Sequence, residues 1–554
     1  MRNILEKITA KMEDFLHENL MFILLISIFN YLGYASSRYI FGKYMYSSIL
    51  NKGFKLIFGY LNITLFFILI FFMVFLLSKK VSKFIMRLFF LLSLFLFIID
   101  AFLMSKFHLI INGTTVQILA ETNNSESMEF LKSNISIGSI VLIFILFFLC
   151  YLIPKIKVNI RSKKVLLVIA VLSFAQIFGI KSNLRALPIQ RLADGISIAK
   201  ENKRIYEELK NKINNDVEIV ENNSKIPNVV FIIGESTTRN HMGIYGYTLP
   251  TTPLLNKLEK RGNLFKFSDV ISAHGQTIPS VKKMITFYNG ESEKEWYQYN
   301  NIIDIMKKAG YKTYWFSNQE SKGLFGNLPA AYGNRSDVVL FNANRDSDQE
   351  VYDVYDEQIV KKSIDKIGKD SKNYVIYHLL GTHKAYKNRY PQEFSKFNID
   401  DYKNTKYEDE QKETVSEYDN AVLYNDFVVN SIIDIFKDKD AIVIYLSDHG
   451  EEVYDFRDLA DHGEGNISHY MVEIPFLIYV SDKFKENYPE KVEKIKKAVS
   501  RPYMTDDVIH TILDISDIKT TEYDPTRSVI NDKFILRDRK IHEKSYDNYW
   551  KTLN

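Results

Sequence analysis

The sequence predicts a protein of two parts: five membrane-spanning helices, followed by an α/β domain with a mostly parallel sheet flanked by helices. At 554 residues the chain is too long for one ordinary domain. Residues up to about 180 are dominated by Phe, Leu and Ile, whereas the remainder is rich in Lys, Asp, Glu, Asn and Tyr. From Pro227 onward, short apolar runs alternate with helical patterns, which is typical of parallel sheets covered by helices.

Five segments of the first part are long and apolar enough to cross a bilayer, which takes roughly 20 residues each. The alternative, a set of buried helices in a soluble protein, is disfavoured by runs such as LFFILIFFMVFLL at 65–77, because such runs are typical of transmembrane helices. The five expected spans are 19–35, 54–78, 84–104, 137–153 and 165–180.

Two short connecting loops are strongly basic: KKVSK at 79–83 and KIKVNIRSKK at 155–164. Positive charge keeps short loops in the cytoplasm. With five spans, the amino terminus is then cytoplasmic and everything after residue 180 lies outside. The first span is not a cleaved signal peptide, since no small-residue cleavage site follows it and further spans do.

The predicted division is a transmembrane domain at 1–181, a bridging helix and linker at 182–226, and an exported domain at 227–554. Within the first domain, 108–132 alternates apolar and polar residues in a helical pattern and is expected to lie at the outer membrane surface. It offers Glu121 and Asn123 to a lipid headgroup, although a solvated polar face is the alternative explanation.

The composition bears on nucleic-acid binding and on disulfides. The formal net charge of +4 is small for this length and gives no support to nucleic-acid binding. The single cysteine, Cys150, falls inside the fourth expected span. The exported domain therefore has no disulfides, and its stability must come from a large core.

Two of the expected strands end in metal-binding side chains. The apolar run 229–233 leads to Glu235, and the run 441–446 leads to Asp448 and His449. Open α/β sheets bind ligands at the carboxyl ends of their strands. Together these side chains can hold zinc or a hard metal without any cysteine.

Thr277 is the candidate for activation by that metal. It lies just before Pro279, a residue favoured in the first turn of a helix, and a helix amino terminus suits a phosphate. A Thr hydroxyl is a weak nucleophile, but next to a divalent cation its proton leaves more easily. The alternative is an ordinary helix-capping Thr, which the neighbouring metal motifs make the poorer explanation.

Further polar residues also follow predicted strands. His383 comes just after the strand at 374–380, and His462 follows the Asp448–His449 pair by one loop. Histidines there can bind phosphate oxygens or protonate a leaving alkoxide near neutral pH, although a lone surface histidine usually does neither. Asn318 and Lys322 follow the strand at 312–316 and offer amide and ammonium donors.

Taken in order, these motifs resemble the phosphoethanolamine transferases, which are membrane-anchored members of the alkaline phosphatase and sulfatase superfamily. The five spans, the Glu121–Asn123 loop and the bridging helix agree with the resemblance, so it covers nearly the whole chain. The motifs that carry it are GESTTR at 234–239, YGY at 245–247, TTP at 251–253, Thr277 with Ser280, Val281 and Met284, KG at 322–323, GTH at 381–383, NRYP at 388–391 and SDHGE at 447–451.

The resemblance implies a site for Zn²⁺, in preference to Mn²⁺. Its ligands would be Glu235, Thr277, Asp448 and His449. The phosphoethanolamine group would be bound by His383, His462, Asn318 and Lys322, with His469 as the alternative to His462. The stretch EEVYDFRD at 451–458 is closer to branches acting on core sugars or periplasmic glucans than to the lipid A branch.

The implied activity is a transfer in two displacements. Thr277 attacks the phosphorus of phosphatidylethanolamine, releasing diacylglycerol and leaving a covalent phospho-threonine, from which a cell-envelope glycan such as lipooligosaccharide, lipid A or a core sugar takes the group. The implied location is the bacterial inner membrane, with a multi-pass anchor, a cytoplasmic amino terminus and a periplasmic catalytic domain. The expected partners are the donor lipid, the glycan acceptor and the membrane, and a monomer is expected.

Three alternatives remain at this point. A phosphoglycerol transferase would share the spans, the Thr nucleophile and the metal, but would use phosphatidylglycerol. A sulfatase is disfavoured because Thr277 stands where Cys or Ser is needed to form an aldehyde. An inactive membrane sensor with the same fold is also disfavoured, because it has no need for convergent polar groups.

Overall fold

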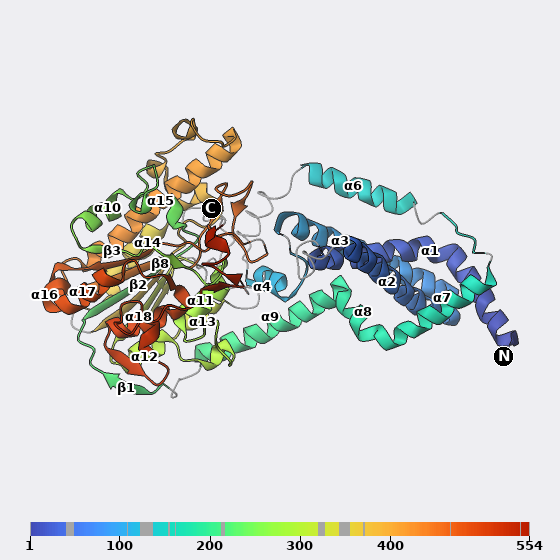
Figure 1. Ribbon diagram of the computed structural model, residues 1–554, viewed down its shortest axis with the longest axis horizontal. Coiled ribbons are helices and arrows are strands. Elements are labelled where there is room, and N and C mark those ends of the chain that lie inside the picture. Colours follow the sequence, from blue (N-terminus) through green and yellow to red (C-terminus); the bar gives the residue numbers. More distant parts are fainter. Residues whose placement is uncertain are drawn as a thin grey trace. The chain divides into compact units, whose positions relative to one another are not determined.

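The computed structural model of the protein describes residues 2–39, 49–107, 109–121, 137–152, 156–160, 162–211, 217–319, 327–342, 355–368, 372–465, 467–542 and 544–552. The chain divides into two compact units, Met1–Asn202 and Lys203–Asn554, which are described in turn (Figure 1). Helix α9 (Pro188–Asn211) runs across this division, and the predicted boundaries after residues 181 and 226 stay predictions.

Three long helices dominate the first unit: α1 (Arg2–Tyr39), α2 (Ile49–Leu77) and α3 (Lys79–Phe107). Aromatic side chains pack between them; the ring of Phe15 lies 5.5 Å from that of Phe72. Their outer sides are apolar too, with Phe84 68% and Phe95 59% exposed, which suits lipid rather than water. Within the described ranges, three segments are long and apolar enough to cross a membrane: Glu6–Arg38, Leu50–Leu77 and Lys79–Lys106.

The described part of the fourth predicted span and the helix at the fifth each have fewer residues than a full span. Helix α6 (Ile137–Leu152) has 16 residues and α7 (Lys163–Ala175) has 13, against the roughly 20 that cross the hydrocarbon core. After α7 the chain tightens into the 3-10 turn Gln176–Gly179 and continues as α8 (Ile180–Ala186). The structure therefore supports three of the predicted spans, and the total of five stays a prediction.

The predicted surface helix at 108–132 is represented by α4 (Gly113–Glu121), and 122–132 lies outside the described residues. A buried ion pair fixes the chain just before it. Asp100 accepts from the backbone N–H of Ile111 at 2.8 Å and pairs with Arg191 of α9 at 2.5 Å. The first turns of α9 are thereby tied to the end of α3.

The second unit is built on one large sheet. Among the described residues it has seven strands in the order β3-β11-β8-β2-β7-β5-β6, and β11 is antiparallel to both its neighbours while the remaining pairs are parallel. The four apolar runs named as strands in the sequence, 229–233, 312–316, 374–380 and 441–446, all contribute to it. The bounds are β2 (Asn228–Gly234), β3 (Leu264–Lys266), β5 (Lys312–Ser317), β6 (Val338–Phe341), β7 (Asn373–His378), β8 (Ala441–Ser447) and β11 (Phe476–Val480).

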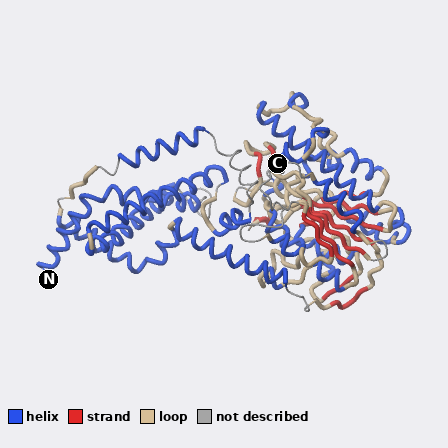
Figure 2. The backbone as a smooth tube through the Cα atoms, turned by 180° about the vertical axis from the view of Figure 1, so that it is seen from behind, coloured by secondary structure: helices blue, strands red, loops and turns tan. Residues whose placement is uncertain are grey.

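Helices cover both faces of this sheet (Figure 2). Alternate residues of a strand point to opposite faces, and β2 follows the rule: Val229 and Phe231 join one core, whereas Val230 and Ile232 join the other. One face carries α11 (Thr277–Ile285), α12 (Ile302–Lys308), α13 (Leu328–Gly333), α16 (Asp482–Asn487), α17 (Pro489–Ala498) and α18 (Val508–Ile515); the other carries α10 (Pro253–Lys260), α14 (Asp356–Ser363) and α15 (Asp409–Phe436).

Short strand pairs complete the unit and fix its loops. They are β1 (Ile219–Asn222) with β13 (Ile518–Thr520), β4 (Val270–Ile271) with β12 (Tyr503–Met504), β9 (Glu452–Val453) with β10 (Ala460–Asp461), and the hairpin β14 (Lys540–Ile541) with β15 (Lys544–Ser545).

Candidate metal centre and active site

The site begins where β2 and β8 end side by side. Gly234 pairs in register with Ser447, so Glu235 and Asp448 leave the sheet at the same point. The backbone N–H of Asp448 donates to the carbonyl of Gly234 at 3.0 Å. One ligand atom each from Glu235, Asp448 and His449 lies within 4.8 Å of the others, and all three side chains are buried.

Thr277 joins this group from the first turn of α11. Its Oγ1 lies 3.2 Å from Glu235 Oε2, 3.3 Å from Glu235 Oε1 and 3.4 Å from His449 Nε2. The structure therefore brings all four predicted ligands together. The free N–H groups of a first helical turn favour an anion beside Thr277.

Asp448 and His449 have atoms that fit a divalent cation. Asp448 Oδ1 accepts from the backbone N–H groups of Ser236 and His449, at 3.3 and 2.7 Å. Its Oδ2 is buried and has no hydrogen-bond partner among the described residues. His449 Nδ1 lies 2.8 Å from the carbonyl of Gly450; it must donate there, which leaves the Nε2 lone pair for a metal.

The electrostatics of the site also call for a cation. Burial raises the pKa of Asp448 well above its usual value, and the charge of Glu235 raises it further. Burial opposes ionisation of Glu235 as well, but the neighbouring His449 holds its pKa well below the usual value. Burial lowers the pKa of His449, yet Asp448 and Glu235 outweigh this and raise it to about 10. Two buried carboxylates this close need a shared positive charge. Without a metal the protonated His449 supplies it, and a zinc ion, which suits carboxylate and imidazole donors, would take the place of that proton.

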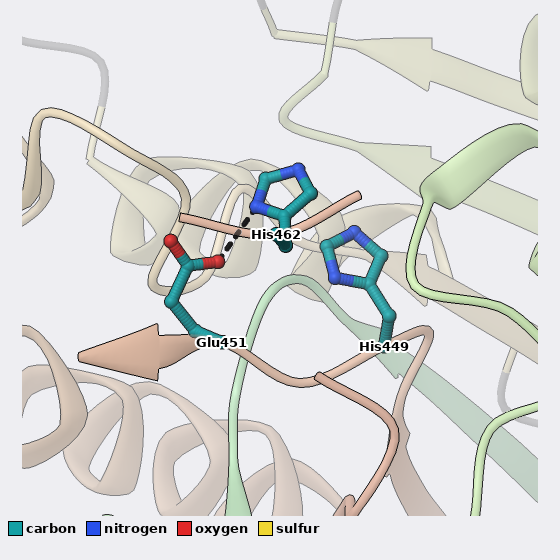
Figure 3. A group of neighbouring side chains, drawn as sticks. All are labelled: His449, Glu451 and His462. Carbon is teal, nitrogen blue, oxygen red and sulfur yellow. Dashed lines mark hydrogen bonds and ion pairs between the residues drawn. The ribbon is translucent and has the colours of Figure 1, made fainter. Parts of the chain in front are cut away.

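Two predicted histidines lie against the metal group. The ring centroid of His462 is 4.3 Å from that of His449 and 5.9 Å from that of His383. Figure 3 shows the His449 and His462 rings side by side, with Glu451 joined to His462. Burial lowers the pKa of His383 to about 3, so its ring is neutral and can accept as well as donate at neutral pH.

His469, the alternative to His462, is placed differently. Its ring contacts Phe456 and Tyr470, with centroids 5.6 and 4.2 Å away. The geometry thus favours His462 as the second substrate histidine, and its binding role stays a prediction.

Asn318 and Lys322 do not gain support from the structure. The Asn318 amide is buried; it donates to Asp356 at 2.8 Å and accepts from Asn342 at 2.8 Å. Lys322 lies outside the described residues. Their proposed contacts with substrate stay predictions.

Three residues that the sequence did not single out make hydrogen bonds that orient the side chains of the site. Gln319 Nε2 donates to Glu235 Oε2 and to the Leu379 carbonyl, both at 3.0 Å. Glu451 Oε2 lies 2.6 Å from His462 Nδ1, and Tyr386 donates its hydroxyl to Glu451 Oε1 at 2.5 Å. Glu451 falls within the recognised SDHGE motif, whereas nothing local in the sequence indicates that Tyr386 reaches it.

One glycine is required by close packing at the site. Gly381 adopts φ +53°, and a Cβ there would lie 2.6 Å from the Glu235 carbonyl oxygen. Both facts exclude a larger residue without rearrangement. The backbone N–H groups of Leu380 and Gly381 donate to Asp356 at 2.9 and 2.8 Å, which holds the loop leading to His383 against Glu235.

Comparison with known proteins identifies the family. The sulfatase family matches residues 227–518. The phosphoethanolamine transferase EptC of Escherichia coli O18:K1:H7 (strain RS218 / NMEC) is 31% identical over 460 residues, covering 75% of this chain and 77% of EptC. The chain belongs to the phosphoethanolamine transferases. This transferase is thus an enzyme of the sulfatase-like superfamily, as its motifs predict.

Two solved structures agree with this assignment. The periplasmic domain of E. coli EptC, solved as a zinc complex, is 33% identical and matches with a TM-score of 0.55 over 60% of this transferase and 96% of that domain. The integral membrane lipooligosaccharide phosphoethanolamine transferase EptA of Neisseria meningitidis has a TM-score of 0.61 over 92% of this chain and 97% of its own, at 19% identity. The second match shows that the fold is shared across the membrane-anchored part as well.

Proposed function

We propose that this transferase moves phosphoethanolamine from phosphatidylethanolamine to a cell-envelope glycan through a covalent intermediate on Thr277. The observation that carries the proposal is the placement of Thr277 Oγ1, 3.2 to 3.4 Å from Glu235 Oε2 and His449 Nε2. A hydroxyl held among buried metal-ligand side chains at a helix amino terminus is suited to attack a phosphodiester.

Thr277, Glu235 and His462 carry out the first displacement. Glu235 accepts the hydrogen bond of the Thr277 hydroxyl and takes its proton as the Oγ1–phosphorus bond forms. The bond from phosphorus to the diacylglycerol oxygen breaks, and His462 protonates that oxygen. Glu451 accepts the hydrogen bond of His462 Nδ1 and so holds the ring with Nε2 available for this step.

The second displacement reverses these roles. A glycan hydroxyl gives its proton to His462 and attacks the same phosphorus, while Thr277 Oγ1 leaves and regains its proton from Glu235. A zinc ion held by Glu235, Thr277, Asp448 and His449 lowers the pKa of the Thr277 hydroxyl and neutralises charge on the transferred group when bound.

The acceptor class and the location are part of the same proposal. Relatives include the Kdo(2)-lipid A phosphoethanolamine 7''-transferase of E. coli K12, 30% identical over 47% of this chain, and the lipooligosaccharide enzyme EptA. A glycan of the outer envelope is therefore the acceptor that relatives support. The basic loops at 79–83 and 155–164 support an inner-membrane anchor with five spans, a cytoplasmic amino terminus and a periplasmic catalytic unit.

The test uses the purified full-length protein in vesicles that contain phosphatidylethanolamine or phosphatidylglycerol, each labelled in its headgroup. Intact-mass and peptide analysis should find one phosphoethanolamine on Thr277 with the first lipid and no adduct with the second. The Thr277→Ala variant should form no adduct and no product. Normal turnover by that variant would refute the nucleophile, and a phosphoglycerol adduct would identify the other donor.

A further inference from the structure

The C-terminal segment at 539–552 lies beyond the part of the chain that the sulfatase family matches, which ends at residue 518. Within the second unit it is linked to both ends of the segment that leads to the nucleophile, from Asp269 to Thr277: directly at Asp269 and through Glu464 at Gly275. Between these contacts the nucleophile segment includes only β4, a strand of two residues. Its position therefore depends on what holds its two ends.

The first contact is made at Asp269, immediately before β4. Arg539 donates from Nη1 to Asp269 Oδ1 at 2.8 Å and to the Asp269 carbonyl at 3.0 Å. Lys551 Nζ lies 2.7 Å from Asp269 Oδ2. Arg539 is 3% exposed and also pairs with Asp547 at 2.5 Å, so this end is fixed by a network of charges centred on a buried arginine.

The second contact is made two residues before the nucleophile. Glu464 Oε1 accepts from the backbone N–H of Gly275 at 2.9 Å and lies 3.1 Å from His274 Nδ1. His542, which directly follows β14, places Nε2 3.1 Å from Glu464 Oε2 and 3.2 Å from the Glu464 carbonyl. Because both of these oxygens only accept, His542 Nε2 donates to Glu464.

Packing beside these bonds leaves the loop little room. A Cβ on Gly275 would lie 3.3 Å from Ile467 Cδ1 and 3.4 Å from the Gly463 carbonyl. Ile541 and Tyr546 of the C-terminal segment share a buried apolar cluster with Ile271 and Ile467. The C-terminal segment and the nucleophile segment thus form one packed unit.

A third contact supports the same segment through Glu473 and Arg239. Tyr546 donates its hydroxyl to Glu473, and Glu473 Oε2 lies 3.2 Å from Arg239 Nη2. Arg239 in turn donates to the carbonyls of Ser268 and Val270, at 3.1 and 3.3 Å. Three separate contacts therefore connect the C-terminal segment with the strand before Thr277.

We propose that the C-terminal segment positions the nucleophile, and that His542 does so by holding Glu464 against the side chain of His274 and the backbone N–H of Gly275. This inference rests on the proposed role of Thr277. It makes His542 and Glu464 positioning residues, because neither touches the reacting atoms. If the C-terminal segment only stabilised the fold, its variants would change Tm. If it positions Thr277, they change the rate of the chemical step.

His542 offers a clean test because its side chain is 46% exposed, so its hydrogen bond contributes little to folding. In the full-length protein, His542→Ala should lower kcat roughly tenfold to hundredfold, since small displacements of reacting groups have effects of this size. KM, bound zinc and Tm should stay at wild-type values. His542→Gln keeps a side-chain donor and should recover most of kcat.

Two further variants complete the experiment. Lys540→Ala, at a position on the same hairpin that is 61% exposed, should behave as wild type. Glu464→Ala should lose kcat as His542→Ala does, whereas Glu464→Gln keeps an acceptor for Gly275 and should lose far less. A wild-type kcat in His542→Ala, or a loss of kcat that follows a loss of zinc or of Tm, would overturn the inference.

The test of the positioning role can be told apart from the test of Thr277 as the nucleophile. An inactive Thr277→Ala variant beside a fully active His542→Ala variant would reject only the positioning role. A fully active Thr277→Ala variant would reject the nucleophile itself, whatever the hairpin variants do.

Discussion

Glu451 Oε2 lies 2.6 Å from His462 Nδ1, and this contact decides which nitrogen of the imidazole is available for chemistry. A carboxylate only accepts, so Nδ1 carries the proton and donates it to Glu451. His462 Nε2 is then the nitrogen left for substrate, beside His449 (Figure 3). The other oxygen of Glu451 accepts from Tyr386, whose own pKa is raised by burial and by Glu451, so its hydroxyl stays protonated.

Glu451→Gln should lower kcat about tenfold to hundredfold, the usual effect of losing a partner that orients a functional histidine. The two donors, Tyr386 and His462, would face one amide oxygen and one amide N–H, so one of them must turn away. Steady-state transfer rates measure the effect. Tyr390→Phe, which removes a hydroxyl whose partners are Asn420 and Ser395, is the control and should keep the wild-type kcat. An unchanged kcat in Glu451→Gln would show that His462 needs no orientation.

Gln319→Ala should weaken zinc binding about tenfold to hundredfold, because Gln319 Nε2 holds Glu235 Oε2 at 3.0 Å and orients the carboxylate. Competition with a chelator of known affinity measures the change. Gln298→Ala removes an amide that accepts from the backbone N–H of Glu295 at 3.0 Å and should leave the affinity unaltered. Equal zinc affinity in Gln319→Ala and wild type would assign Gln319 a purely structural role.

Strand ends explain why so much of the site was predictable. Glu235, His383 and Asp448 each follow an apolar run, and parallel strands bring such positions to one edge of the sheet. Thr277 could be added because Pro279 marks the start of a helix. These patterns are local, so one sequence is enough to read them.

The parts that sequence reasoning missed depend on non-local contacts. Asn318 and Gln319 are neighbours with similar amides, yet only Gln319 reaches Glu235, because the backbone N–H of Asn318 still bonds to β7 and sets which way each side chain leaves the strand. Tyr386 meets Glu451 across 65 positions, and Arg539 meets Asp269 across 270. The total of five spans stays a prediction, because hydropathy does not show where a helix such as α7 ends.

His241 gives the protein a pH-dependent stability that is separate from catalysis. Burial lowers its pKa, but Asp455 and Asp419 outweigh this and raise the pKa from 6.5 to about 10. A raised pKa stabilises the fold fully below the unfolded value of about 6.5, and this stabilisation is lost as the pH rises through 10. The stabilisation involved is on the order of 5 kcal/mol.

The Tm of the full-length protein should therefore fall between pH 7 and pH 10, and the slope should be smaller in His241→Gln. His510→Gln is the matched control, because burial lowers the pKa of His510 to about 3 and keeps it neutral across this window. Thermal unfolding at several pH values measures both slopes. Equal slopes in wild type and His241→Gln would show that the charge on His241 is not retained in the folded state.

Asp448→Asn should abolish zinc binding while leaving the fold intact. Asp448 Oδ1 accepts from two backbone N–H groups, so the new amide must place its oxygen there and its NH₂ at the position of Oδ2. That position then carries two hydrogens where a metal needs a lone pair. Elemental analysis of the purified variant should find little zinc, with Tm measured on the metal-free proteins staying close to that of wild type.

The same variant separates loss of metal from loss of structure. Chelated wild-type protein should lose transfer and regain it on addition of zinc, whereas Asp448→Asn should not respond to zinc. Asp426→Asn is the matched control, because Asp426 is a buried carboxylate that caps the backbone N–H groups of Leu254 and Leu255 at 2.9 Å, away from the metal group. A full complement of zinc in Asp448→Asn would remove Asp448 from the ligand set and leave its unpaired oxygen to be explained by a different cation or by substrate.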